Sequence, residues 1–158
     1  MLQKMRERLG ARLRNEESGF TLVELLVVML ILGILAAIAI PSFFNQRDKA
    51  GDAEAKASAK TAQTAMETFA TENNGNYTGA DVAALVAIEP TLGGLGANLT
   101  VSGVAANTYT VSVNSSTLND FNIARGAGGG LTYTCTVDAS NGTNRGGCPT
   151  GGNWAGDN

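Results

Sequence analysis

The chain contains no histidine and has few charged or aromatic residues. Of its 158 residues, 16% are charged and 6% are aromatic. Without histidine, both the commonest general base and the commonest zinc ligand are missing. Serine–histidine and cysteine–histidine catalysis are therefore excluded. Because no other acid–base constellation stands out, the sequence gives little support to a hydrolase, and we expect no enzymatic activity.

Cysteine is scarce too. Cys135 and Cys148 are the only two, and they enclose a loop rich in glycine and asparagine. With no further cysteine or histidine nearby, the pair argues against a zinc site. Outside the cytoplasm such a pair usually forms a disulfide, whereas in the cytoplasm it would stay as two reduced thiols. The apolar segment described below favours the disulfide.

Charge is divided unevenly along the chain. Five basic and three acidic side chains precede Gly19, whereas the rest of the chain carries six basic and eleven acidic ones. An acidic body argues against binding to a phosphate backbone as its main task. No direct nucleic-acid site is predicted.

One long apolar run, residues 19–40, contains a single carboxylate, Glu24. About 20 apolar residues cross roughly 30 Å of bilayer as a helix. A charge costs about 2.5–3.5 kcal/mol at the bilayer centre and less near its edge. Glu24 therefore either lies at the interface or is kept for a partner. A secretory signal, with an Ala-x-Ala pattern at residues 37–39, and an ordinary single-pass anchor are the alternatives.

Neither alternative explains the residues at the start of the run, which read Gly19-Phe20-Thr21-Leu22-Val23-Glu24-Leu25. Followed by an apolar helix with Gly33 and Pro41, this stretch resembles the type IV pilin family, including the pseudopilins of type II secretion. The resemblance is specific over residues 19–45 and general beyond them. It implies that a prepilin peptidase cuts between Gly19 and Phe20 and methylates the new N-terminus at Phe20.

The resemblance also implies an assembly role for Glu24, whose family counterpart pairs with the N-terminal amine of a neighbouring subunit, here that of Phe20. In a dry helix bundle this pairing would offset the desolvation of both charges. The family counterparts of Gly33 and Pro41 bound a stretch that can loosen in the fibre. Proline removes one helical hydrogen bond, so a simple kink is an equally good interpretation.

Three segments follow from this comparison. We expect a cytoplasmic leader at 1–19 that is removed on processing, an apolar helix half at 20–44 for the membrane and filament core, and an extracytoplasmic globular domain at 45–158. Basic residues flank the span on both sides, so the positive-inside rule hardly favours either orientation. The cysteine pair and the cleavage motif place the leader inside, in a single-pass precursor of the cytoplasmic membrane that later joins a cell-surface pilus.

The predicted fold is α+β. Good helix formers continue through residues 45–72, and an apolar stripe recurs at helical spacing, so we expect one helix from about Leu22 to Glu72. The stripe consists of Ala55, Ala59, Ala62, Met66 and Phe69. Turn residues at 73–76 end this helix, with Gly75 as the left-handed position.

A short helix from Asp81 to about Ile88 and a flexible, glycine-rich connection at 93–96 come next. Period-two alternation then predicts a three- or four-stranded antiparallel meander. Its strands fall near 98–102, 109–113, 121–123 and 131–137, and its apolar face would cover the stripe. The last strand contains Cys135, so a disulfide would hold the C-terminal loop against it.

That loop offers four oxygen ligands, which makes a calcium site conceivable. They are Asp138, Asn141, Asn144 and Asp157. Their spacing matches no calcium loop, so a solvated loop is favoured, and no metal or cofactor is predicted.

The sequence therefore predicts a filament subunit that supports adhesion, motility or DNA uptake. Its partners would be further copies of itself in a helical filament, the prepilin peptidase, the inner-membrane assembly machinery and the membrane. A pseudopilin is the nearest alternative, although major pseudopilins carry a tail with Pro-Trp-Gly-Asn, whereas this chain has Gly151-Gly152-Asn153-Trp154 behind its cysteine pair. A monomeric membrane-anchored ectodomain that binds a ligand is the alternative of a different class.

Overall fold

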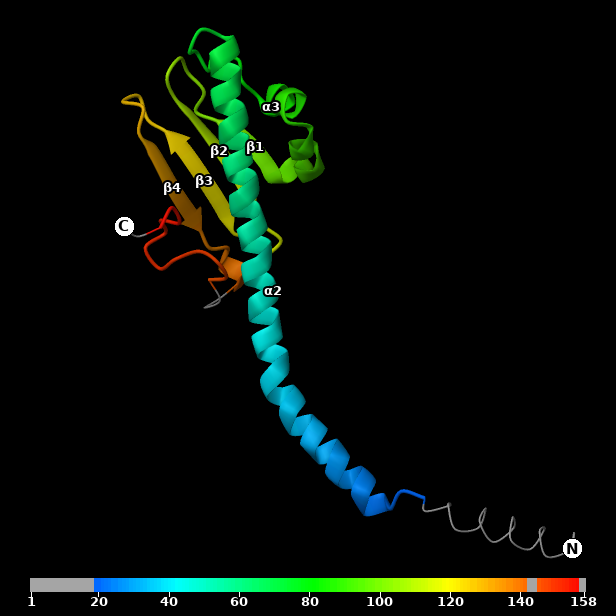
Figure 1. Cartoon of the computed structure of the whole chain (residues 1–158). Coiled ribbons are helices and arrows are strands. Elements are labelled where there is room, and N and C mark those ends of the chain that lie inside the picture. The colour runs from blue at the N-terminus through cyan, green and yellow to red at the C-terminus, as the bar shows by residue number, and fades with distance from the viewer. Residues whose placement is uncertain (1–18, 142–144, 157–158) are drawn as a thin grey trace, which may run out of the picture. The chain divides into compact units, whose positions relative to one another are not determined.

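The computed structural model describes residues 19–141 and 145–156. The chain divides into two compact units, at Met1–Ser42 and Phe43–Asn158, and helix α2 contributes to both. The elements in chain order are α2 (Leu22–Glu72), α3 (Val82–Ile88), η1 (Pro90–Asn98), β1 (Leu99–Ser102), β2 (Tyr109–Asn114), β3 (Asp120–Arg125), β4 (Leu131–Thr136) and η2 (Ala139–Asn141). Figure 1 labels α2, α3 and the strands β1 to β4.

Helix α2 begins and ends where the sequence predicts. It runs unbroken from Leu22 to Glu72. Asn74 and Gly75 stop it by adopting left-handed backbone angles, with φ of 57° and 82°. The amide of Gly75 donates to the carbonyl of Ala70 at 2.7 Å, which closes the last turn.

The short helix α3 also agrees with its sequence signals. The carboxylate of Asp81 accepts a hydrogen bond from the amide of Ala84 at 2.7 Å and so caps the first turn. The connection after it differs from expectation, because residues 90–98 form 3₁₀ turns rather than a flexible link. Leu92 explains the order of this segment, since it is buried in the core.

The sheet is a four-stranded antiparallel meander in the order β1-β2-β3-β4. Alternate residues of its two central strands point into the core and are fully buried. These are Tyr109, Val111, Val113, Phe121 and Ile123. Figure 1 shows the strands lying beside the C-terminal part of α2, so the predicted α+β layer pair is confirmed.

The α2 stripe is wider than the sequence pattern indicated. Ala55, Ala59, Ala62 and Met66 are buried, whereas Phe69 is only half-buried. Ala65, Ala70 and Asp52 are buried as well. Alanine at most of these positions keeps the helix surface flat and lets the sheet approach closely. Asp52 is the only charged residue among these buried positions of α2.

Candidate assembly helix and the anchored C-terminal loop

The N-terminal half of α2 exposes its apolar side chains on every side. All large hydrophobic residues between Leu22 and Phe44 are exposed, by 47% to 73%. A window of 18 residues in this helix reaches a mean hydropathy of 2.9, so its length and composition suffice to cross a membrane. Exposed apolar surface of this extent marks a segment that needs lipid or other helices around it.

Thr21 and Glu24 form a capping box at the start of this helix. The Thr21 hydroxyl accepts a hydrogen bond from the Glu24 amide, and the Glu24 Oε2 atom accepts from the Thr21 amide, each at 3.2 Å. The Thr21 hydroxyl lies 3.2 Å from the same carboxylate oxygen. Two otherwise unpaired amides are thereby satisfied. The pattern Thr-x-x-Glu was the sequence signal for this box, and the sequence reasoning above did not use it.

The box holds the carboxylate of Glu24 at the positive end of the helix dipole, where a negative charge is favoured. Both hydrogen bonds that the carboxylate accepts use its Oε2 atom. Within residues 19–141 and 145–156, no hydrogen bond to Oε1 of Glu24 is found. Phe20 precedes the helix and is 87% exposed.

Gly33 and Pro41 both lie inside continuous α2, which contains Pro41 as its one proline. The backbone is helical on both sides of each residue. No other part of the described chain lies within 4 Å of a Cβ placed on Gly33. Whether this stretch loosens in a fibre stays a prediction.

Several known proteins are similar to this chain in its N-terminal segment. The family model described as the prokaryotic N-terminal methylation motif matches residues 14–40. The type IV major pilin protein PilA of Myxococcus xanthus is 42% identical over 64 residues, which is 40% of this chain and 29% of that protein. Type II secretion system core protein G of Pseudomonas aeruginosa is 40% identical over 60 residues, or 38% of this chain and 42% of that protein.

A third relative extends the likeness through the globular unit. The type IV wide pilus major component PilA4 of Thermus thermophilus is 34% identical over 126 residues, covering 80% of this chain and 86% of that protein. This chain belongs to the type IV pilin family. The matched part of the chain spans less than half the length of the first two relatives. No solved structure matches the chain significantly.

The globular unit of this pilin-family chain ends in a loop that a disulfide holds. Cys135 on β4 is bonded to Cys148, with 5.8 Å between their Cα atoms, which confirms the predicted pairing. Closing a loop of 13 residues stabilises the fold by about 3 kcal/mol. Trp154 secures the segment beyond: its indole N–H donates to the carbonyl of Thr134 at 2.8 Å, and its ring packs edge-on against Tyr133 and Phe121.

Asp52 of α2 connects the helix to two other segments. Its Oδ1 atom accepts from the Thr117 hydroxyl at 2.6 Å. Its Oδ2 atom accepts from the Asn119 amide group at 2.9 Å and from the Gly147 amide at 2.6 Å. Burial by itself would raise the pKa of this fully buried carboxyl, but hydrogen bonds from Ser115, Thr117, Gly147 and Asn119 outweigh it and lower the pKa.

Gly146 and Gly147 allow the disulfide loop to approach that carboxylate. A Cβ at Gly146, where φ is 55°, would overlap Asp52 Oδ2, and a Cβ at Gly147 would lie 2.9 Å from the Asp52 Cβ. Lys56, one turn along α2, donates to the carbonyl of Gly147 at 2.5 Å. The helix therefore binds the loop through a backbone amide and a backbone carbonyl at once.

A second polar cluster lies farther along α2. The carboxylate of Glu67 accepts hydrogen bonds from the hydroxyls of Tyr77 at 2.7 Å and Tyr109 at 2.8 Å, and it pairs with Arg125 at 3.2 Å. Burial, followed by the hydrogen bond to Glu67, raises the pKa of both tyrosines above 10.0. This cluster joins the helix to β2 and β3, and no sequence pattern pointed to it.

The candidate calcium ligands are only partly within the described residues. Asn144 and Asp157 lie outside them. Asp138 accepts from the amide of Ser140 at 2.8 Å, and the side chain of Asn141 donates to the carbonyl of Thr117 at 2.8 Å. Within the described part of the chain, no three His, Cys, Asp or Glu side chains come together as a metal site would require.

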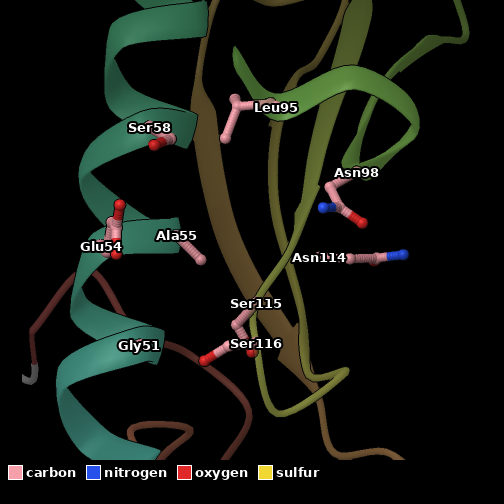
Figure 2. Close-up of a pocket in the computed structure, with 9 residues that line it drawn as sticks. All are labelled: Gly51, Glu54, Ala55, Ser58, Leu95, Asn98, Asn114, Ser115 and Ser116. Atoms are coloured by element: carbon pink, nitrogen blue, oxygen red, sulfur yellow. The ribbon is translucent and has the colours of Figure 1, made fainter.

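Cavities open on the surface of the globular unit. One of about 190 Å³ lies between α2, η1 and the turn after β2, and Figure 2 shows serine, asparagine and glutamate side chains around it. Another, of about 410 Å³, is bordered by threonines of α2 together with Ile88 and Glu89.

Members of the type IV pilin family are structural subunits.

Proposed function

We propose that this chain is a structural subunit of a type IV pilus-like filament. The observation that carries the proposal is the likeness to a major pilus component across both the apolar helix and the globular unit. The exposed apolar half of α2, with the Glu24 carboxylate in the capping box at its start, also supports the proposal, because such a helix suits a filament core. Adhesion, motility or DNA uptake would be outputs of the assembled fibre.

Processing comes first in this proposal. A prepilin peptidase removes residues 1–19 by cutting between Gly19 and Phe20, and the new N-terminus at Phe20 is methylated. The match of residues 14–40 to the methylation-motif family supports this step. Phe20 is highly exposed and precedes the first helical residue, so the bond to be cut lies outside regular structure.

Assembly uses the charge of Glu24. The new amine at Phe20 of one copy pairs with the Glu24 carboxylate of another as the apolar helices pack together. In that dry bundle, the pairing offsets the desolvation of both ions. The Oε1 atom of Glu24 accepts the incoming amine, while Oε2 keeps the capping hydrogen bond to Thr21.

Before assembly, the precursor is held in the inner membrane by residues 20–44 as a single span with its N-terminus inside, and residues 45–158 lie outside. Further copies of the chain, the peptidase and the inner-membrane assembly machinery are its partners. A pseudopilin role is the second candidate, because a type II secretion core protein matches the helical segment over 60 residues.

The first prediction concerns Glu24→Gln. Glutamine also serves in a capping box, so this change keeps the helix start while it removes the charge. We expect sheared surface fibres to disappear while the chain stays in the membrane fraction. Mass spectrometry of sheared wild-type material should find an abundant peptide that begins at methylated Phe20. The exposed acid Glu54 on the same helix provides the matched control, since Glu54→Gln should leave fibre yield unchanged.

Each alternative has its own outcome. Wild-type fibres from Glu24→Gln would contradict the proposal and favour a monomeric anchored ectodomain. A chain that retains Met1 in membranes and is absent from sheared material would contradict both processing and assembly. Normal surface fibres in a strain lacking this chain, together with a loss of protein secretion, would favour the pseudopilin.

A further inference from the structure

Leu118 combines two properties that a surface turn does not require. Its side chain is 61% exposed, and its backbone adopts a left-handed φ of 63°. Asn74 is the other such non-glycine residue in the described chain, and it sits at a helix end where asparagine is common. A bulky residue at positive φ is a genuine outlier, because its Cβ crowds the backbone. Outliers of this kind gather at functional sites.

The turn that presents Leu118 is firmly fixed to α2. Within the turn, the amide of Leu118 donates to the carbonyl of Ser115 at 3.0 Å. The residues on either side of Leu118, Thr117 and Asn119, both donate to the buried carboxylate of Asp52. The backbone that carries the side chain is therefore held in a fixed place, while 61% of the residue stays exposed.

Close packing brings the same turn against the helix. Figure 2 shows Ser116 beside Gly51 of α2, where a Cβ on the glycine would collide with the serine hydroxyl. Gly51 therefore allows the turn to lie directly on the helix. Asp52 and Gly51 together set the position of Leu118 relative to the adjoining part of α2.

We propose that Leu118 is a subunit contact that docks on the Phe43–Phe44 segment of α2 in a second copy of the chain. This inference rests on the proposed filament function. Every other exposed large hydrophobic residue in the described chain lies between residues 20 and 44, so that stretch is the apolar surface a second copy offers. Phe43 and Phe44, 66% and 52% exposed, belong to the same compact unit as Leu118.

Phe43 and Phe44 are the last residues of the exposed apolar stretch and the part of it that belongs to the globular unit. Within one copy, Phe44 precedes Asp52 by eight residues, which is about 12 Å of helix. A lipid surface is the other apolar partner to consider. Because lipid adapts to any apolar side chain, it gives no reason for a strained and rigid placement, whereas a protein surface of fixed shape does.

The test compares fibre yield with the stability of the same variant. Asparagine tolerates left-handed backbone angles better than leucine. Leu118→Asn should therefore not lower the melting temperature of the full-length chain in detergent, followed by the near-UV circular dichroism of Trp154. We expect its sheared-fibre yield to fall about tenfold, which corresponds to about 1.4 kcal/mol of lost association free energy.

Two control variants separate the effect of the apolar side chain from the effect of the left-handed backbone angle. Leu118→Met keeps an apolar side chain of similar size and should keep wild-type fibre yield. Asn74→Gly relieves the other left-handed position without removing apolar surface, and it should also leave fibres unchanged. Wild-type yield from Leu118→Asn would overturn the contact, and so would a melting temperature that falls together with the yield.

Cross-linking tests the chosen occupant directly. When a chain carrying Leu118→Cys is co-assembled with a chain carrying Phe44→Cys, oxidised fibres should give dimers on non-reducing gels. The pair Leu118→Cys with Glu72→Cys, at the opposite end of α2, should give none. Absence of dimers from the first pair would overturn the choice of the Phe43–Phe44 segment.

Failure of this inference is distinguishable from failure of the proposed function. If the wild-type chain forms no fibres, or if Glu24→Gln forms them normally, the filament itself is refuted. If the wild type assembles, Glu24→Gln does not, and Leu118→Asn assembles like the wild type, only the Leu118 contact is refuted.

Discussion

A single carboxylate, Asp52, connects three parts of the globular unit. It sits on α2, fully buried, and accepts hydrogen bonds from the turn after β2 and from the disulfide loop. Buried charges are tolerated when hydrogen bonds replace the water they lose. At this scale, the position of the C-terminal loop depends on one side chain as well as on the disulfide.

We expect Asp52→Asn to lower the free energy of unfolding at neutral pH by about 3 kcal/mol. The new amide group would face hydrogen-bond donors from Thr117, Asn119 and Gly147, and one donor would remain unsatisfied. Thermal melts of the full-length chain in detergent, followed by near-UV circular dichroism, measure the loss. Glu54→Gln is the matched control, because it removes an exposed carboxylate from the same helix without breaking these bonds.

The same comparison has a pH dependence whose sign follows from the lowered pKa of Asp52. The folded pKa lies below the ordinary value of 3.8, so the charged form is the one that folding favours. Its contribution is fully present above about pH 4 and is lost as the pH falls through the folded pKa. The stability gap between wild type and Asp52→Asn should therefore close in acid. A gap that stays constant down to pH 2 would contradict this role.

At the scale of elements, α2 has two different surfaces. Its first half exposes apolar side chains all round, and its second half buries a stripe of small residues against the sheet. Alanine at positions 55, 59, 62 and 65 allows the strands to lie close to the helix axis. The packing of this layer pair therefore depends on small volume at the stripe more than on large apolar area.

We expect Ala62→Leu to destabilise the globular unit by about 1–3 kcal/mol, because three extra carbons must enter a fully packed interface. Ala62 has no exposed surface. The measured quantity is the near-UV melting temperature in detergent. Ala57→Leu makes the same chemical change on the exposed face of the same helix, and it should leave the melting temperature unchanged. Equal effects from the two variants would contradict the tight-stripe interpretation.

At the scale of the whole molecule, the chain consists of two units with different sources of order. The unit from Phe43 onward has a core, a disulfide and two polar clusters. The described residues of the other unit, 19–42, are exposed throughout, and from Leu22 onward their own backbone hydrogen bonds hold them as a helix. Those hydrogen bonds are strongest where water is absent, in lipid or in a bundle of helices.

Heating the full-length chain in detergent should therefore produce two steps. The near-UV signal of Trp154 should vanish in a cooperative transition, while part of the far-UV helical signal survives it. The surviving part is the apolar half of α2, which loses no tertiary contacts and stays in the micelle. Ala62→Leu should move the first step and leave the residual helical signal unchanged. Complete loss of helical signal in one coincident transition would contradict this division.

Much of the fold could be predicted because it depends on local patterns. The bounds of α2 and α3, the left-handed Gly75 and the four strands agree with periodicity, capping residues and turn residues. The processing and assembly residues Gly19, Phe20 and Glu24 were visible as a motif, and their roles remain predictions. The Thr21–Glu24 capping box was also readable, since its two members are three residues apart.

Contacts between distant residues could not be predicted in this way. Asp52 and Gly147 are 95 residues apart, and Glu67 and Arg125 are 58 apart. An aspartate on an alanine-rich helix looks like a solvated side chain until the loop that covers it is placed. The ordered 3₁₀ segment at 90–98 escaped prediction for the same reason, because burial of Leu92 depends on the rest of the core.

The amino-acid sequence by itself determined where the helices and strands lie, which segment is apolar enough for a membrane, and which family the chain belongs to. Only the tertiary structure decided that Asp52 and Glu67 are joined to the sheet and the disulfide loop, and that Leu118 is exposed on a rigid turn. The physical reason is the distance along the chain over which each interaction acts. Backbone propensity and side-chain periodicity act over a few residues, whereas burial and hydrogen-bond partners depend on segments that meet only when the chain has folded.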